Sequence, residues 1–354
     1  MSTLDGVNGT VYDTQQNKQP FSIYADSTIL TNGQSIGLAL IAEASSLSLC
    51  AIIVVFILIA RNLLRYRKVL PNGDWKLLRT PADIYMLSLF LYDIVQAVGG
   101  ILNVRWAHDG VVTTGPYCTA QGIIKQIGKL GVPLLTLILA IHTFTIALWN
   151  VGAEARYFAF SIVAFTCLFV ALWAGISNGV HKDFEMPTPY WCSIGPNKER
   201  LAGQYVWIWI ALFASVAMYI PVYFWMKGHL SVDGDKWYKF RLVKSDVEYS
   251  KRRATLGILL YPLAYSLVVI PLSISRWLLF SHKDVPSAAI FFGDIMFSLS
   301  GAINVLLFLT VRPHLLLFTP PNELGESSVE PDISTTIFLD MTKHKRSPQV
   351  TDDV

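Results

Sequence analysis

The chain has 354 residues, of which 53% are hydrophobic and only 15% are charged, and its mean hydropathy of +0.45 indicates an integral membrane protein. The net charge of +3 is small, and no basic block is interleaved with aromatic residues, so nucleic-acid binding has no support. Residues 1–36 are polar and contain no basic start followed by a short apolar run, so we expect no cleaved signal peptide.

Seven apolar segments follow this polar start. Each has about 20 residues or more, which is the length that a helix needs to cross about 30 Å of hydrocarbon. They predict an all-α membrane protein, in which a seven-transmembrane helix bundle at 37–313 crosses the lipid bilayer as a multi-pass domain. The predicted spans are 37–60, 81–103, 118–149, 157–180, 203–226, 254–280 and 287–311.

Lysine and arginine are distributed unequally between the predicted loops. With the N-terminus outside, the cytoplasmic segments contain 19 of these residues and the exterior segments contain 6. Because basic residues accumulate on the cytoplasmic side, we expect 1–36 to be extracellular and the C-terminus to be cytoplasmic. The only glycosylation sequon, at Asn8, lies on the predicted outside. Residues 314–354 are polar without apolar periodicity, which predicts a disordered cytoplasmic tail.

Two of the four cysteines fall on the predicted outside, with Cys118 at the mouth of the third span and Cys192 in a loop. The exterior is oxidising, so we expect a disulfide between them that ties this loop over the bundle. Two free thiols are the less favoured alternative. Cys50 and Cys167 lie inside apolar spans and are expected to be buried small hydrophobic residues.

The third span carries two lysines at a depth where charge is costly. An unpaired charge within the membrane costs on the order of 3 kcal/mol, so these lysines need anionic partners. The spacing of four places Lys125 and Lys129 on one helix face, which Gln121 extends outward.

Three further charges lie towards the same side of the membrane: Glu43, Arg276 and Asp294. One interpretation is a cationic pocket for a small anionic or polar extracellular ligand, bound by Lys125, Lys129, Arg276, Asp294 and Gln121. The alternative is internal neutralisation, in which Asp294 and Glu43 pair with the lysines and hold the first, third and seventh spans together. The two interpretations are compatible.

Polar residues deeper in the bundle are candidates for a conformational switch. Asp93 lies midway along the second span and Asn304 lies at a similar depth in the seventh, although taken residue by residue a satisfied buried carboxyl is the favoured explanation. His142, near the inner end of the third span, is a further candidate for the switch. Pro262 interrupts the sixth span, and because proline bends a helix, it marks this span as a moving part.

The predicted inner loop at 227–253 contains eight basic residues and closes with Lys251, Arg252 and Arg253. It is either a docking surface for a cytosolic partner or a consequence of topology and of attraction to anionic lipid. Only one histidine lies within a span, which disfavours a metal site, and the absence of lysine from 287–311 excludes the retinal Schiff base of an opsin. We therefore expect no enzymatic activity, no cofactor and no metal.

Seven spans, an outer N-terminus, an outer cysteine pair and a basic third inner loop together resemble a G-protein-coupled receptor. Several strings resemble the fungal receptors related to slime-mould cyclic AMP receptors, and are also similar to fungal glucose-sensing receptors. These strings are Ala140-Ile141-His142-Thr143-Phe144, Tyr190-Trp191-Cys192, Tyr261-Pro262-Leu263-Ala264-Tyr265 and Gly301-Ala302-Ile303-Asn304. The chain lacks the Asp-Arg-Tyr and Asn-Pro-x-x-Tyr motifs of rhodopsin-like receptors, and its short 227–253 loop favours the cyclic AMP receptor-like group.

This resemblance implies a plasma-membrane receptor that binds a small extracellular ligand. Opening of the sixth helix at Pro262 would then admit the α subunit of a heterotrimeric G protein, with Lys251, Arg252 and Arg253 in contact; homodimerisation stays open. The alternative is a proton-coupled transporter or channel that uses the intramembrane aspartates and lysines as a polar path. It is disfavoured because the inner half of the bundle is nearly free of charge.

Overall fold

The computed structural model describes residues 27–69, 77–78, 80–149, 156–180, 184–226, 230–232, 240–242, 249–281 and 283–311. Asn8 and 314–354 lie outside this part of the chain, as do the side chains of Lys251, Arg252, Arg253 and Pro262.

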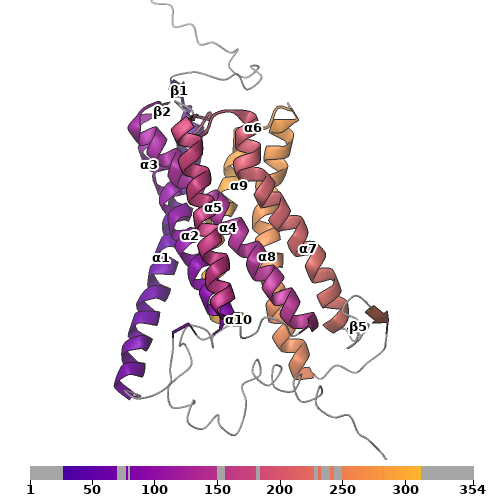
Figure 1. The fold of residues 1–354 in the computed structure, drawn as a ribbon. Coiled ribbons are helices and arrows are strands. Elements are labelled where there is room, and N and C mark those ends of the chain that lie inside the picture. The colour runs from indigo at the N-terminus through magenta and orange to yellow at the C-terminus, as the bar shows by residue number, and fades with distance from the viewer. Residues whose placement is uncertain are drawn as a thin grey trace, which may run out of the picture.

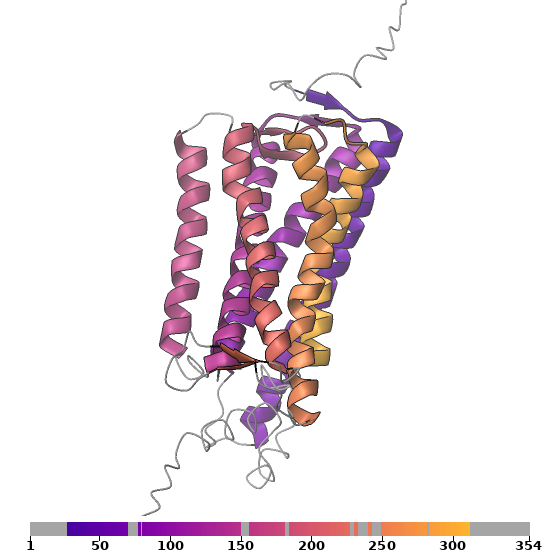
Figure 2. The same ribbon diagram turned by 90° about the vertical axis from the view of Figure 1, so that its right-hand side faces the viewer.

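Long helices run side by side as one bundle (Figures 1 and 2). The last of these rods is made of two consecutive helices, which meet at Leu299, whose backbone amide still bonds to the Ile295 carbonyl. The predicted seven-helix fold is therefore confirmed. The long helices are α1 (Asn32–Val69), α2 (Pro81–Ile101), α4 (Pro116–Trp149), α5 (Arg156–Val180), α7 (Val206–Met226), α8 (Tyr249–Phe280), and α9 (Ser287–Ser298) with α10 (Ser300–Val311).

Six of these rods, within the described residues, are long and apolar enough to cross a membrane. Helix α8 contributes a shorter apolar stretch at Ala264–Phe280, because its side chains are described only from Ala264 onwards. The first helix extends well beyond the predicted 37–60 at both ends, since polar residues continue the helix past the apolar stretch. The chain is a multi-pass membrane protein.

Short elements cover one end of the bundle, the upper end in Figure 1. Strand β1 (Ser27–Ile29) pairs antiparallel with β2 (Val111–Thr113), next to the short helix α3 (Asn103–Asp109). Strands β3 (Glu185–Pro187) and β4 (Cys192–Ile194) form a hairpin, with Glu185 opposite Ile194. We call this the capped end and the β3–β4 unit the hairpin.

At the capped end, α6 (Asn197–Arg200) leads through a π-helical turn, Leu201–Tyr205, into α7. At the opposite end, β5 (Leu230–Val232) pairs with β6 (Phe240–Leu242) within the predicted inner loop (Figures 1 and 2). None of the three strand pairs was predicted from the sequence, because strands of three residues are too short to show a periodicity.

Local sequence explains where α2 begins. Thr80 and Asp83 form a capping box, in which the Thr80 amide donates to Asp83 Oδ2 (2.7 Å) and the Asp83 amide donates to Thr80 Oγ1 (3.3 Å). Pro81 occupies the first turn, where its missing N–H leaves no helical hydrogen bond unmade. These signals start the helix at the residue predicted from apolar content.

Glycines on α4 let it approach α2 closely. A Cβ atom at Gly128 would lie 2.7 Å from the backbone of Gln96, and one at Gly131 would overlap the ring of Tyr92. Small residues permit such backbone contact between helices in membranes. This contact holds the neighbouring face of α4, which carries Lys125 and Lys129, against the second helix.

The outer surface of the bundle is apolar, as a lipid-facing surface must be. Phe165 and Phe213 each expose 70% of their surface, although they are among the most hydrophobic residues of the chain. Cys50 and Cys167 are also exposed free thiols, so the expectation that they are buried was wrong. Apolar content placed them within helices, but it could not show which face of the helix they occupy.

Candidate ligand site

Four of the residues predicted to bind ligand meet in the capped half of the bundle, and all four are buried. Lys129 on α4 donates to Asp294 Oδ1 on α9 at 3.1 Å, and Arg276 on α8 donates to Asp294 Oδ2 at 3.1 Å. Asp294 thus accepts one charged hydrogen bond on each oxygen and joins three helices. These pairs are the internal neutralisation that the sequence suggested, with Arg276 in addition.

Glu43 takes no part in this cluster, although the sequence placed it on the same side of the membrane. Its side chain is exposed on the outer face of α1. The neutralising role that was expected of it was therefore wrong, since the helix turns this residue away from the bundle.

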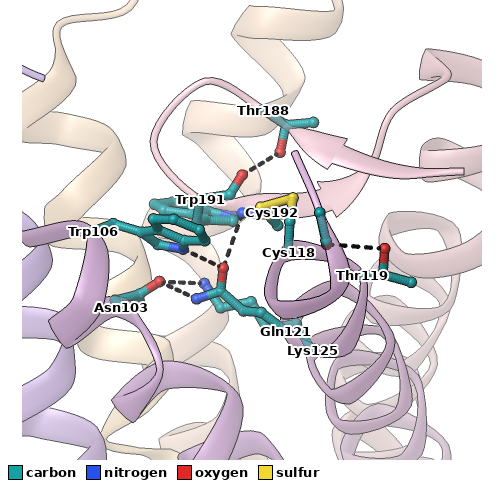
Figure 3. Close-up of a disulfide and its surroundings, with 10 residues drawn as sticks. Asn103, Trp106, Cys118, Thr119, Gln121, Lys125, Thr188, Trp191 and Cys192 are labelled. Carbon is teal, nitrogen blue, oxygen red and sulfur yellow. Dashed lines mark hydrogen bonds between the residues drawn. A yellow bond between two sulfur atoms is a disulfide. The ribbon is translucent and has the colours of Figure 1, made fainter. Parts of the chain in front are cut away.

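Lys125 differs from the other two cations because it has no carboxylate partner among the described residues. Its Nζ donates instead to Asn103 Oδ1 at 3.0 Å (Figure 3). The same oxygen accepts the Gln121 Nε2 amide at 2.8 Å. Within the described part of the chain, a neutral amide oxygen is thus the only direct acceptor of this buried ammonium group. A buried charge usually has a charged partner.

Gln121 connects the lysine to the cap. Its Oε1 accepts Trp106 Nε1 from α3 at 2.6 Å and the Cys192 backbone amide from β4 at 3.1 Å (Figure 3). With one N–H of its Nε2 on Asn103, three of the four hydrogen-bonding positions of this side chain are in use. In this structure Gln121 holds α3, α4 and the hairpin together; its predicted contact with ligand stays a prediction.

The cations are covered by one aromatic ring from the hairpin. The centroid of the Trp191 ring lies 4.4 Å from Lys125 Nζ, 5.3 Å from Arg276 Cζ and 5.4 Å from Lys129 Nζ. These distances allow cation–π attraction with each of the three groups. Only 2% of Trp191 is exposed, so the indole closes the site from the capped end.

The hairpin that carries this ring is fastened to α4. Cys118 and Cys192 form a disulfide, which confirms the predicted pair, and Trp191 is the residue before Cys192 (Figure 3). The Trp191 carbonyl accepts the Thr188 amide at 2.8 Å, which closes the turn of the hairpin. The roles of Trp191 and Asn103 were not predicted from the sequence. The position of Trp191 next to a bridged cysteine was the one signal that could have indicated its role.

A cavity of about 20 Å³ lies beneath the cluster, which is room for about one water molecule. It is therefore too small to admit an organic ligand. It is lined by Ile41, Gln96, Gly100, Lys125, Lys129, Asp294, Phe297 and Ser298.

Polar contacts continue from this cavity towards the middle of the bundle. Gln96 Nε2 donates to the Phe297 carbonyl (3.0 Å) and to Ser300 Oγ (2.9 Å), on either side of the α9–α10 junction. Asn304 Nδ2, on α10, donates to Asp93 Oδ2 at 2.8 Å. The structure thus brings together Asp93 and Asn304, two of the residues predicted to form a switch.

His142 lies elsewhere, further along α4, where its ring packs edge-on against Tyr85 at 5.2 Å between centroids. In the described part of the chain no three His, Cys, Asp or Glu side chains are grouped as metal ligands.

Outside the membrane-spanning helices, the hairpin buries one acidic residue. Burial raises the pKa of Glu185 to about 8, and the neighbouring Asn178 amide opposes this only in part. Neither carboxyl oxygen has a hydrogen-bond partner of good geometry among the described residues. The carboxyl group rests directly on Gly122 of α4, where a Cβ atom would overlap it.

The chain matches no family model, and no curated protein is similar to it in sequence. Solved structures do match, among them squid rhodopsin, with a TM-score of 0.56 and 13% sequence identity over 92% of this chain and 98% of that one. The chain has the seven-helix fold of squid rhodopsin. Since only 13% of residues are identical, the likeness concerns the fold alone. Helices α9 and α10 contain no lysine.

Proposed function

We propose that this chain is a G-protein-coupled receptor of the plasma membrane, related to the cyclic AMP receptor-like group, which senses a small extracellular ligand and activates a heterotrimeric G protein. The observation that carries the proposal is the cluster of three buried cations beneath Trp191, two of which pair with the same carboxylate, in a bundle with the fold of squid rhodopsin. Ionisable groups at membrane depth are costly and are functional by default.

Two observations favour an extracellular capped end. The disulfide at this end requires an oxidising compartment, and the predicted loops at the same end contain 6 basic residues against 19 at the other. In this orientation a ligand reaches the cations from outside after displacing or bypassing the hairpin.

The hydrogen-bonded residues beneath the cavity provide a route for the signal. A ligand that draws Lys129 or Arg276 away from Asp294 changes the position of α9, and the α9–α10 junction bonds to Gln96 and leads to the Asp93–Asn304 pair. A ligand shifts such an equilibrium only by its different affinity for the two states. Movement of α8 at Pro262 and contact of Lys251, Arg252 and Arg253 with the Gα subunit complete the proposed mechanism.

The test is GTP exchange on Gα, co-reconstituted with the purified receptor in lipid discs, against a panel of sugars, nucleotides, amino acids and lipids. We expect one class to stimulate exchange, Lys125→Glu to abolish the response at unchanged surface expression, and Asn304→Ala to reduce exchange while binding persists. Lys283→Glu is the matched control, since Lys283 is an exposed cation of the same end. A normal response of Lys125→Glu contradicts the site, and ligand flux without G protein would favour the transporter alternative.

A further inference from the structure

The buried cluster contains more hydrogen-bond donors than acceptors. Both oxygens of Asp294 are occupied, by Lys129 and by Arg276. Lys125 has only the amide oxygen of Asn103, while Arg276 Nε and Asn103 Nδ2 are buried without an acceptor among the described residues. Buried donors without acceptors are costly, so the site is one acceptor group short.

That group has to carry at least one negative charge. Three cations face one carboxylate, which leaves two positive charges over, and Lys125 is the cation of the four-residue cluster that makes no contact with a carboxylate. The face of the Trp191 indole offsets this in part, because its negative π surface lies 4.4 Å from Lys125 Nζ. A cation–π contact is weaker than a buried charge-assisted hydrogen bond of good geometry.

The space available defines the rest of the ligand. The cavity beneath the cluster has room for about one water molecule. The indole itself is buried against Phe291 and Tyr190 at the capped end. A ligand that reaches the cations from the capped end must therefore take the place of the indole. The ring is carried by a turn of the hairpin, next to the disulfide that keeps the backbone at Cys192 on α4 (Figure 3).

We propose that the Trp191 indole is a tethered substitute for the ligand, and that the ligand is a small organic monoanion with a flat apolar body. The ligand expels the indole, fills its place with the apolar body, and bonds its single acid group to Lys125 and Arg276. The inference rests on the proposed function in placing the ligand at this end, but binding itself requires no G protein.

The experiment is complementation of Trp191→Ala by free indoles of different charge: indole-3-acetate (anion), 3-methylindole (neutral) and tryptamine (cation). Equilibrium binding and the shift of the unfolding temperature are measured on purified receptor. We expect indole-3-acetate to bind Trp191→Ala at least tenfold more tightly than it binds the wild type, and at least tenfold more tightly than either other probe binds the variant.

Lys125→Met in the Trp191→Ala background should remove this preference for the anion, and Lys283→Met in the same background should leave it intact. Equal affinity of the three indoles for Trp191→Ala, or a preference for the anion that survives Lys125→Met, overturns the proposal.

The wild-type protein supplies a second measurement, which does not depend on the folding of a variant. Saturating indole-3-acetate should accelerate backbone hydrogen exchange across 185–194, because the ring leaves the core, whereas 3-methylindole should not. Unchanged exchange with the anion overturns the proposal. Anion binding without any GTP exchange would contradict the proposed receptor function alone, and exchange driven by a neutral or cationic ligand would contradict the present inference alone.

Discussion

Asp294→Asn should destabilise the protein far more than the loss of one side chain usually does. The carboxylate lies 3.1 Å from Lys129 Nζ and 3.1 Å from Arg276 Nη2. At an effective dielectric constant of about 20, each pair contributes about 5 kcal/mol of Coulomb energy. Most of this is offset by the desolvation of the carboxylate, so removing one partner of a buried pair typically costs about 3–5 kcal/mol.

Two pairs share this carboxylate, so we expect a loss of about 5 kcal/mol, at the upper end of that range. At roughly 2 °C per kcal/mol for a chain of this size, the unfolding temperature should fall by about 10 °C. The neutral amide leaves all three cations buried without an anion, and this is the physical cause of the loss.

Lys125→Met is the matched comparison within the same cluster. Lys125 has no carboxylate partner, and Asn103 Oδ1 keeps its hydrogen bond from Gln121 when the lysine is replaced. Methionine is apolar and similar in length, so the substitution removes a buried charge without leaving a large cavity. We expect unchanged stability or a gain of about 1 kcal/mol or more.

The assay is thermal unfolding of both variants and the wild type, purified in the same detergent, pH and salt, with a monodisperse elution profile as the criterion of folding. The reasoning is refuted when Lys125→Met loses as much stability as Asp294→Asn, because charge would then not be the quantity that matters. Asp294→Asn combined with Lys129→Met should recover part of the loss, since fewer unpaired cations remain.

Three further results are expected. Cys192→Ser, or reductant on the wild type, should lower stability by about 2–4 kcal/mol and weaken ligand binding, and an unchanged unfolding temperature would count against a structural bridge. Burial raises the pKa of Glu185 from 4.5 to about 8, so the folded protein keeps a proton that the unfolded chain releases, and stability falls as pH rises from about 4.5 to 8. Glu185→Gln should flatten this slope in unfolding measured between about pH 6 and 9; a slope equal to that of the wild type contradicts the assignment. Gly131→Ala should cost about 1–3 kcal/mol because its Cβ would overlap a ring of α2, whereas Gly175→Ala, with open space around it, should gain up to about 1 kcal/mol; similar effects of the two would disprove the close contact.

The predictions that succeeded depend on properties that are local along the chain. The lengths of the apolar segments predicted the seven long helices. The third span, predicted at 118–149, is a helix from Pro116 to Trp149. The position of Cys118 and Cys192 on the predicted oxidising side of the membrane predicted their disulfide. The period of the helix also places Lys125 and Lys129 on one face, because this relation holds within a single helix whatever surrounds it.

Relations between helices could not be obtained in this way. Glu43 and Cys50 lie on the exposed side of α1, and nothing in an almost uniformly apolar segment shows how that helix is rotated. The same limit applies to the contact between Asp93 and Asn304. Their similar depth was predicted, but their hydrogen bond depends on how α2 packs against α10.

By itself the sequence determined a seven-helix membrane protein, a bridged pair of cysteines, and a cost of buried charge that some partner has to offset. The tertiary structure decided which partner serves which cation, since Asp294 reaches Lys129 and Arg276 but leaves Lys125 to Asn103. It also decided that Trp191 covers all three cations, because the place of that ring depends on a hairpin register and on a disulfide between residues 74 positions apart.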